Sequence, residues 1–211
     1  MHVWFGSILG PDGKPFKTRS GEVVRLADLL DEAQERAYAV VSEKNADLDE
    51  TQRREIARVV GLGALKYADL SNNRQTDYVF DWNKMLALQG NTAPYLQYAY
   101  TRVRSIFRKV DAPDFSNITL AASAPEELAL AKHLMNFGQT LEMVAEDHRP
   151  NFLCNYLFEL AGHFSRFYEA CPVLKAKEDA ERESRLALCE LTGRILKTGL
   201  ETLGIEVTEV M

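Results

Sequence analysis

The sequence predicts a mainly α-helical protein, and three observations support this. Apolar residues recur at three- and four-residue steps through most of the chain, which is the pattern of an amphipathic helix. Only residues 2–9, near the start, form the short apolar and aromatic run that is typical of a β-strand. Turn and capping residues separate the periodic segments. We therefore expect one short strand, connecting helices and a helical bundle in the C-terminal half.

Composition limits the class of protein. The 211 residues are 46% apolar and 27% charged, which is ordinary for a globular protein of one large or two small domains. With no signal peptide and no apolar run near the roughly 18 residues of a membrane span, we expect a cytoplasmic protein without membrane contact. The cysteines, Cys154, Cys171 and Cys189, match no metal-ligand or disulfide spacing, which favours a reducing compartment and predicts no metal site.

In the first part of the chain, the strand leads into a turn at residues 10–13, rich in glycine and proline. Helices are then expected at about residues 20–44 and 48–68. Gly61 and Gly63 lie inside the second helix, where each glycine costs about 1 kcal/mol relative to alanine. Their presence indicates close packing against a neighbouring element.

In the second part, Asp81 is expected to cap a short helix that ends near Gly90. A capping-box pattern at residues 123–126 opens a helix that we expect to run unbroken to residue 147. Pro150 starts the next helix. The remaining elements are a helix at residues 94–109, a loop at 111–124, a last helix at 179–203 and an extended tail at 205–211.

The helix expected at residues 94–109 has two adjacent faces. One face is apolar, and beside it Tyr95, Tyr98, Arg102 and Lys109 fall on an arc about 60° wide. Residues 91–109 carry four cationic side chains and no acidic ones, although the whole chain has a net charge of −6. Two interpretations remain open: the tyrosines stack on nucleic-acid bases, or they are core-edge residues with solvated hydroxyl groups.

The loop at residues 10–21 also has two interpretations. Lys14, Lys17 and Arg19 lie between glycines and just before a helix N-terminus, an arrangement that can hold phosphate groups. The loop has no Walker A pattern, and short lysine-rich loops are common on protein surfaces. A solvated hairpin is therefore the simpler interpretation of the spacing alone.

Several long segments resemble arginyl-tRNA synthetases. They are FKTRSG at 16–21, ALKYADLSNNRQTDYVFDW at 64–82, GNTAPYLQYAYTRVRS at 90–105 and the tail GLETLGIEVTEVM at 199–211. The resemblance spans the chain but only the C-terminal part of the family's length. It implies that residues 1–90 are the end of a Rossmann-type class I catalytic domain, with a strand or hairpin and connecting helices. Residues 91–211 would then be the helical anticodon-binding domain of the DALR type.

The resemblance also implies an activity and its residues. Members of this family join arginine to its tRNA using ATP and Mg²⁺, so the expected partners are an arginine tRNA and, in the full-length enzyme, ATP and arginine. Lys17 and Arg19 stand where class I enzymes usually carry Lys-Met-Ser-Lys-Ser, and would help to hold the ATP phosphates. Residues that match anticodon-loop contacts, or extend that strip, are Tyr95, Tyr98, Arg102, Lys109, Met211 and, by a weaker match, Tyr168.

The sequence departs from the family pattern, because it lacks the His-Ile-Gly-His signature and the strands of the amino-acid pocket. We therefore expect these residues alone to bind no ATP and to be inactive, either as the C-terminal portion of the enzyme or as a stand-alone tRNA-binding module. We expect a monomer. Without its parallel sheet, the strand at residues 2–9 is expected to be disordered, to form a hairpin across residues 11–13 or to self-associate.

Overall fold

A computed structural model describes residues 2–14, 25–44, 47–110, 115 and 118–211. In this part of the chain there are eight helices and a two-stranded sheet, so the mainly α class is confirmed. The elements are β1 (Ile8–Leu9), α1 (Leu26–Lys44), α2 (Glu50–Leu70), β2 (Tyr78–Val79), α3 (Trp82–Met85), α4 (Ala93–Phe107), α5 (Pro125–Met135), α6 (Phe137–Asp147), α7 (Asn151–Ala170) and α8 (Asp179–Thr202).

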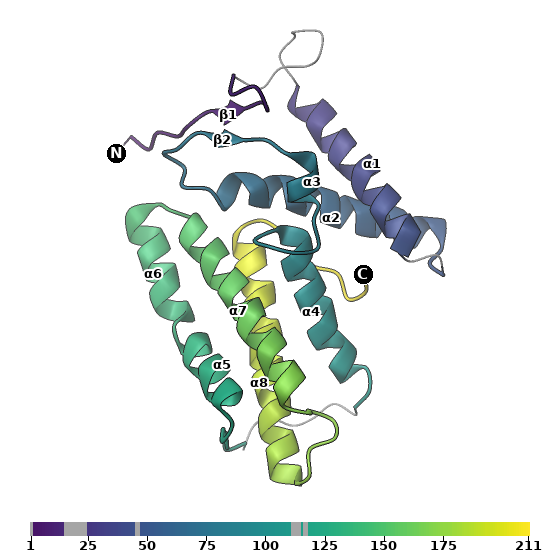
Figure 1. The fold of residues 1–211 in the computed structure, drawn as a ribbon, viewed down its shortest axis with the longest axis vertical. Coiled ribbons are helices and arrows are strands. Elements are labelled where there is room, and N and C mark those ends of the chain that lie inside the picture. The colour runs from purple at the N-terminus through teal and green to yellow at the C-terminus, as the bar shows by residue number, and fades with distance from the viewer. Residues whose placement is uncertain (1, 15–24, 45–46, 111–114, 116–117) are drawn as a thin grey trace.

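Two groups of elements make up the molecule. The helices α1 and α2 lie at one end with the small sheet and α3, and α4 to α8 form a bundle beneath them (Figure 1). After α8 the chain returns to α2, so the C-terminus lies beside α1, α2 and α4 (Figure 1). None of the helices in the described ranges has the length and apolar character of a membrane span.

The two glycines of α2 are helical and lie at close helix contacts, as expected. A Cβ on Gly61 would lie 2.6 Å from the carbonyl oxygen of Ala33 in α1. A Cβ on Gly63 would lie 2.8 Å from Nε2 of Gln97 in α4. The absence of a side chain at both positions allows α1 and α4 to approach α2 on different sides.

The N-terminal strand is shorter than expected and has a distant partner. β1 pairs in parallel with β2, with Ile8 opposite Tyr78 and Leu9 opposite Val79. The N–H of Gly10 donates to the oxygen of Lys14 at 2.7 Å and closes a turn, but the strand itself pairs with β2 instead of forming a hairpin, which was one of the three outcomes expected for it. The apolar side chains before β1 are exposed, as we expected for a strand without a larger parallel sheet beside it; Phe5 is 82% exposed.

The bundle is built on the apolar stripes of α4, α5, α7 and α8. Its fully buried side chains include Leu96, Ile106, Leu130, Leu153, Leu157, Leu160, Phe164, Phe167, Leu188, Leu196 and Leu200. In α4 and α7 these residues lie at the three- and four-residue steps on which the helices were predicted, whereas in α8 Leu191, which was placed on the apolar face, is 37% exposed and Leu196 is buried. The last helix ends where expected, with Gly204 in the left-handed conformation at φ 71°.

The helix predicted at 125–147 is in fact two helices. α5 ends at Met135 and α6 begins at Phe137, with Asn136 between them. The break lets α6 pack on α7, where the ring of Phe137 lies 5.7 Å from that of Tyr156. Our prediction of one helix was wrong because the helix is interrupted at Asn136, after which α6 packs on the helix that follows it.

The start of α5 also differs from the predicted capping box at residues 123–126. The carboxylate that caps this end belongs to Glu127 and accepts the N–H groups of Ser123 at 2.8 Å and Ala124 at 2.9 Å. The same carboxylate accepts Nε of Arg185 in α8 at 2.6 Å. The short helix capped by Asp81 is confirmed, although it ends at Met85, before Gly90.

Candidate RNA-binding face

The first turn of α4 holds the predicted strip in place. Thr92 caps the helix by accepting the N–H of Tyr95 at 3.3 Å, and its own hydroxyl donates to the oxygen of Ala87 at 2.7 Å. The apolar stripe of α4 is buried in the bundle. Tyr98 lies beside this stripe and is 46% exposed, so its ring is accessible from solvent.

On one side, the strip lies against α7. The ring of Tyr95 packs edge-on against Phe158 at 5.7 Å between centroids. The guanidinium of Arg102 lies over the ring of Tyr168, 4.7 Å from its centroid. The structure therefore brings Tyr168, the weakest of the sequence matches, into contact with Arg102, and a cation–π contact orients the guanidinium.

On the other side, Tyr98 borders an apolar cavity of about 340 Å³. The cavity lies between α1, α2, α4 and the C-terminal tail, and its volume is within the range of ligand pockets. Its lining residues are Ala37, Val40, Val41, Lys44, Val60, Leu86, Leu88, Pro94, Tyr98 and Met211. Met211 thus lies at the same cavity as Tyr98, although it is the last residue of the chain.

Lys109, the last residue of the predicted strip, lies apart from this face. Lys109 is exposed beyond the end of α4, and at 1.5 Å per residue it is about 21 Å along the helix axis from Tyr95. The structure does not bring it into the cluster around Tyr98. Lys17 and Arg19 lie outside the described residues.

Two of the four cations near α4 are engaged by the tail. Nε of Arg104 donates to Oε2 of Glu209 at 2.9 Å, and Arg108 donates to the backbone oxygen of Glu209 at 2.8 Å. The hydroxyl of Tyr100 donates to the other carboxylate oxygen at 3.0 Å. In the sequence these cations form one basic segment, and nothing there indicates that Glu209 pairs with them, because its partners are about a hundred residues away.

These contacts shift the titration of both acids in the cluster. Partial burial would raise the pKa of Glu209, but hydrogen bonds from Arg104 and Tyr100 outweigh it and hold that pKa below its ordinary value. Burial, reinforced by the nearby Glu209 carboxylate, raises the pKa of Tyr100 to about 12. At neutral pH, Glu209 is therefore ionised and Tyr100 is a neutral donor.

Comparison with known families assigns the bundle. The family model of the DALR anticodon binding domain matches residues 96–211. The chain belongs to this DALR family. Residues 1–82 match the catalytic domain of the class I (R) tRNA synthetases. Tyr98 and Arg102 of the strip, α7, α8 and most of the buried core lie within the DALR match, and Tyr95 lies just before it.

Individual relatives agree with the two matches. The arginine–tRNA ligases of Proteus mirabilis and Laribacter hongkongensis are 57% and 59% identical to this chain over its full length. This chain spans only 37% and 36% of those proteins. It corresponds to the C-terminal part of an arginyl-tRNA synthetase, comprising the end of the class I catalytic domain and the DALR domain.

Solved structures show the same fold. The arginyl-tRNA synthetase of Thermus thermophilus superposes on this chain with a TM-score of 0.88 and 34% identity, and that of Plasmodium falciparum with 0.82 and 30%. Each comparison covers all of this DALR chain and 35% of the solved chain.

Proposed function

We propose that this chain binds the anticodon arm of an arginine tRNA, as the C-terminal portion of an arginine–tRNA ligase. The observation that carries the proposal is the exposed ring of Tyr98 beside an apolar cavity, on the same helix as a guanidinium held over Tyr168. The DALR match to residues 96–211 supports it. We place the boundary between the two domains at about residue 90, between the two family matches.

The chemistry of the face suits a single-stranded loop. Unstacked bases of an RNA loop bind aromatic rings, and each stacked base contributes roughly 1–3 kcal/mol. Tyr98 offers a ring face, and the adjacent cavity offers apolar surface for a base that leaves the loop. Arg102 supplies a charge for the RNA backbone, and its contact with Tyr168 fixes where that charge lies.

With a net charge of −6, the chain is not expected to bind RNA over a broad basic surface, so binding should be confined to this face. A protein that holds RNA mainly by charge carries a broad basic surface, because phosphate contacts provide most of the non-specific affinity. Here Arg104 and Arg108 are engaged by Glu209. We therefore propose that affinity depends on the shape and the bases of the anticodon loop more than on overall charge.

We also propose that the whole enzyme of which this chain is a part uses ATP with Mg²⁺ and arginine. In that enzyme Lys17 and Arg19 would hold the ATP phosphates while charge develops during adenylation. The DALR domain would supply the tRNA contacts. For the 211 residues alone, we expect tRNA binding without arginylation.

The test is a Tyr98→Ala substitution. Loss of one stacked base should weaken binding to an arginine tRNA by about 5- to 150-fold, the equivalent of about 1–3 kcal/mol. The measurement is a dissociation constant at fixed salt, for this tRNA and for one with a changed anticodon. Phe5→Ala is the control, because Phe5 is an exposed aromatic residue away from the face. An unchanged affinity in the Tyr98 variant would contradict the proposal.

A further inference from the structure

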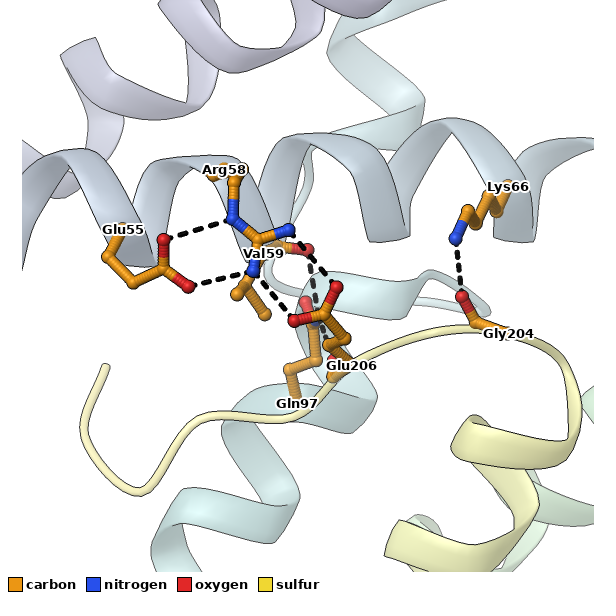
Figure 2. A network of polar contacts seen from close by, with 7 residues as sticks. All are labelled: Glu55, Arg58, Val59, Lys66, Gln97, Gly204 and Glu206. Carbon is orange, nitrogen blue, oxygen red and sulfur yellow. Dashed lines mark hydrogen bonds and ion pairs between the residues drawn. The ribbon is translucent and has the colours of Figure 1, made fainter.

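The C-terminal tail begins with a close contact against α2. Ile205 is buried, and its Cγ2 lies 3.2 Å from the position that a Cβ on Gly63 would occupy. One turn further along α2, Nζ of Lys66 donates to the oxygen of Gly204 (Figure 2). Gly204 and Ile205, just after the last helix, are therefore fixed against a helix from the first part of the chain.

The next anchor is a guanidinium held between two carboxylates. Arg58 in α2 donates to both oxygens of Glu206 in the tail, at 3.0 and 2.6 Å. It also donates to both oxygens of Glu55, one turn earlier in α2, at 2.9 and 2.7 Å. Figure 2 shows the three side chains in one group. Paired contacts of this kind fix orientation as well as distance.

The buried side-chain amide of Gln97 in α4 also binds the tail at Glu206. Nε2 of Gln97 donates to the backbone oxygen of Glu206 at 2.9 Å and to that of Val59 at 3.2 Å. Gln97 is completely buried, and Figure 2 shows its side chain beside Val59 and Glu206. Glu206 is therefore the residue at which α2, α4 and the tail meet.

Beyond this point the tail crosses to the RNA-binding face. Glu209 takes its contacts from Tyr100 and Arg104 on α4. Met211 packs on the apolar cluster of α1 and α2 and lines the cavity beside Tyr98. Met211 is only five positions beyond Glu206, so the position of Glu206 limits where Met211 can lie.

We infer that Arg58 and Glu206 are positioning residues, which hold the tail so that Met211 stays at the cavity beside Tyr98. This inference rests on the proposed role of that face in binding the anticodon arm. The side chains are 34% and 59% exposed, and an ion pair so open to solvent adds little to the free energy of unfolding. Its main effect is geometric, and it links a helix of the catalytic-domain match to the RNA-binding face of the DALR domain.

The test compares Glu206→Lys with Glu55→Lys. Both substitutions change the charge equally and both deprive Arg58 of one partner, but only Glu206 is in the tail. We expect Glu206→Lys to weaken binding to an arginine tRNA by about tenfold, a loss of about 1.4 kcal/mol. Added positive charge alone would tighten RNA binding. Glu55→Lys should therefore bind as well as the parent chain or better.

A second measurement follows the tail itself. In NMR spectra of the chain labelled with ¹³C-methyl methionine, the Met211 signal is identified because it is lost in Met211→Leu. Its chemical shift reports on the ring of Tyr98 and on the cavity around it. It should shift or broaden in Glu206→Lys and stay in place in Glu55→Lys. If Glu206→Lys does not fold, the milder pair Glu206→Gln and Glu55→Gln replaces it, with the same expected contrast.

The outcomes distinguish the positioning role of Arg58 and Glu206 from the proposed function of the face itself. Equal tRNA affinity in the Glu206 and Glu55 variants, or a Met211 signal that moves without loss of affinity, would overturn the positioning role. If Tyr98→Ala in the same series leaves affinity unchanged, the proposed function itself is wrong. A weakened Tyr98 variant together with equal Glu206 and Glu55 variants would remove only the present inference.

Discussion

Tyr95 and Tyr98 are indistinguishable on the predicted strip, but their surroundings differ in the structure. Tyr95 is half-buried and packs edge-on against Phe158. Tyr98 is exposed beside the cavity that Met211 lines. The two interpretations of the strip therefore apply to different residues: Tyr95 has the surroundings of a core-edge residue, and Tyr98 has those of a ring available for stacking.

Glu127 is a residue on which the bundle depends. It is 1% exposed and joins α5 to α8 through Arg185, while it also caps α5. Burial alone would raise its pKa, but Arg185 and the backbone N–H groups of Ser123 and Ala124 lower it below its ordinary value of 4.5. A carboxyl with a lowered pKa stabilises the fold above its unfolded-state pKa and loses that contribution as pH falls through its folded-state pKa.

We predict that Glu127→Gln lowers the free energy of unfolding at pH 7 by about 3 kcal/mol, because it deprives the buried guanidinium of Arg185 of one of its two carboxylate partners, the other being Glu181. The measurement is urea unfolding at pH 7 and below pH 4.5, where the difference from the parent should shrink as Glu127 is protonated. Glu35→Gln, from the exposed Arg54–Glu35 pair, is the control and should cost under about 1 kcal/mol. A Glu127 variant as stable as this control would contradict the prediction.

At the scale of elements, local pattern and tertiary contact decide different things. The positions of α2, α4, α7 and α8 follow from apolar periodicity and caps, which act within a few residues. The break at Asn136 has only Gly138, two residues later, as a local signal, and α6 packs on α7 beyond it. Gly61 indicates that another element packs closely on α2, but the sequence does not show that this element is α1.

We predict that Gly61→Ala destabilises the fold by about 1–3 kcal/mol, because the new methyl group would press on the Ala33 backbone and separate α1 from α2. Gly138→Ala is the matched control: nothing lies within 4 Å of its Cβ position in α6, and helix propensity should add about 0.5–1 kcal/mol. Thermal or urea unfolding measures both. Equal effects of the two substitutions would show that the α1–α2 contact is not tight.

At the scale of the whole molecule, the two-stranded sheet near the N-terminus has an exposed edge at β1. β1 pairs with β2 on one side, and Trp4 and Phe5 just before it are 51% and 82% exposed. An exposed apolar strand edge offers unpaired backbone groups and apolar surface to a second chain. The rest of a catalytic domain would cover this surface in the proposed enzyme.

We predict that the 211-residue chain is a monomer when dilute and self-associates when concentrated, through this edge. Sedimentation velocity over a concentration series measures the change in mass. The double substitution Trp4→Ser and Phe5→Ser should keep the chain monomeric across the series. Association that is the same in the variant and the parent would place the contact elsewhere.

The sequence by itself determined the helical class, most helix positions, the two family regions and the residues of the candidate strip. These depend on local periodicity, on caps and on long motifs, all of which are read over short stretches. Only the tertiary structure decided that β1 pairs with β2, that Arg102 lies over the ring of Tyr168 and that Glu206 and Glu209 in the tail pair with Arg58 and Arg104. Those contacts join residues about 65 to 150 positions apart, and their geometry depends on how the helices pack.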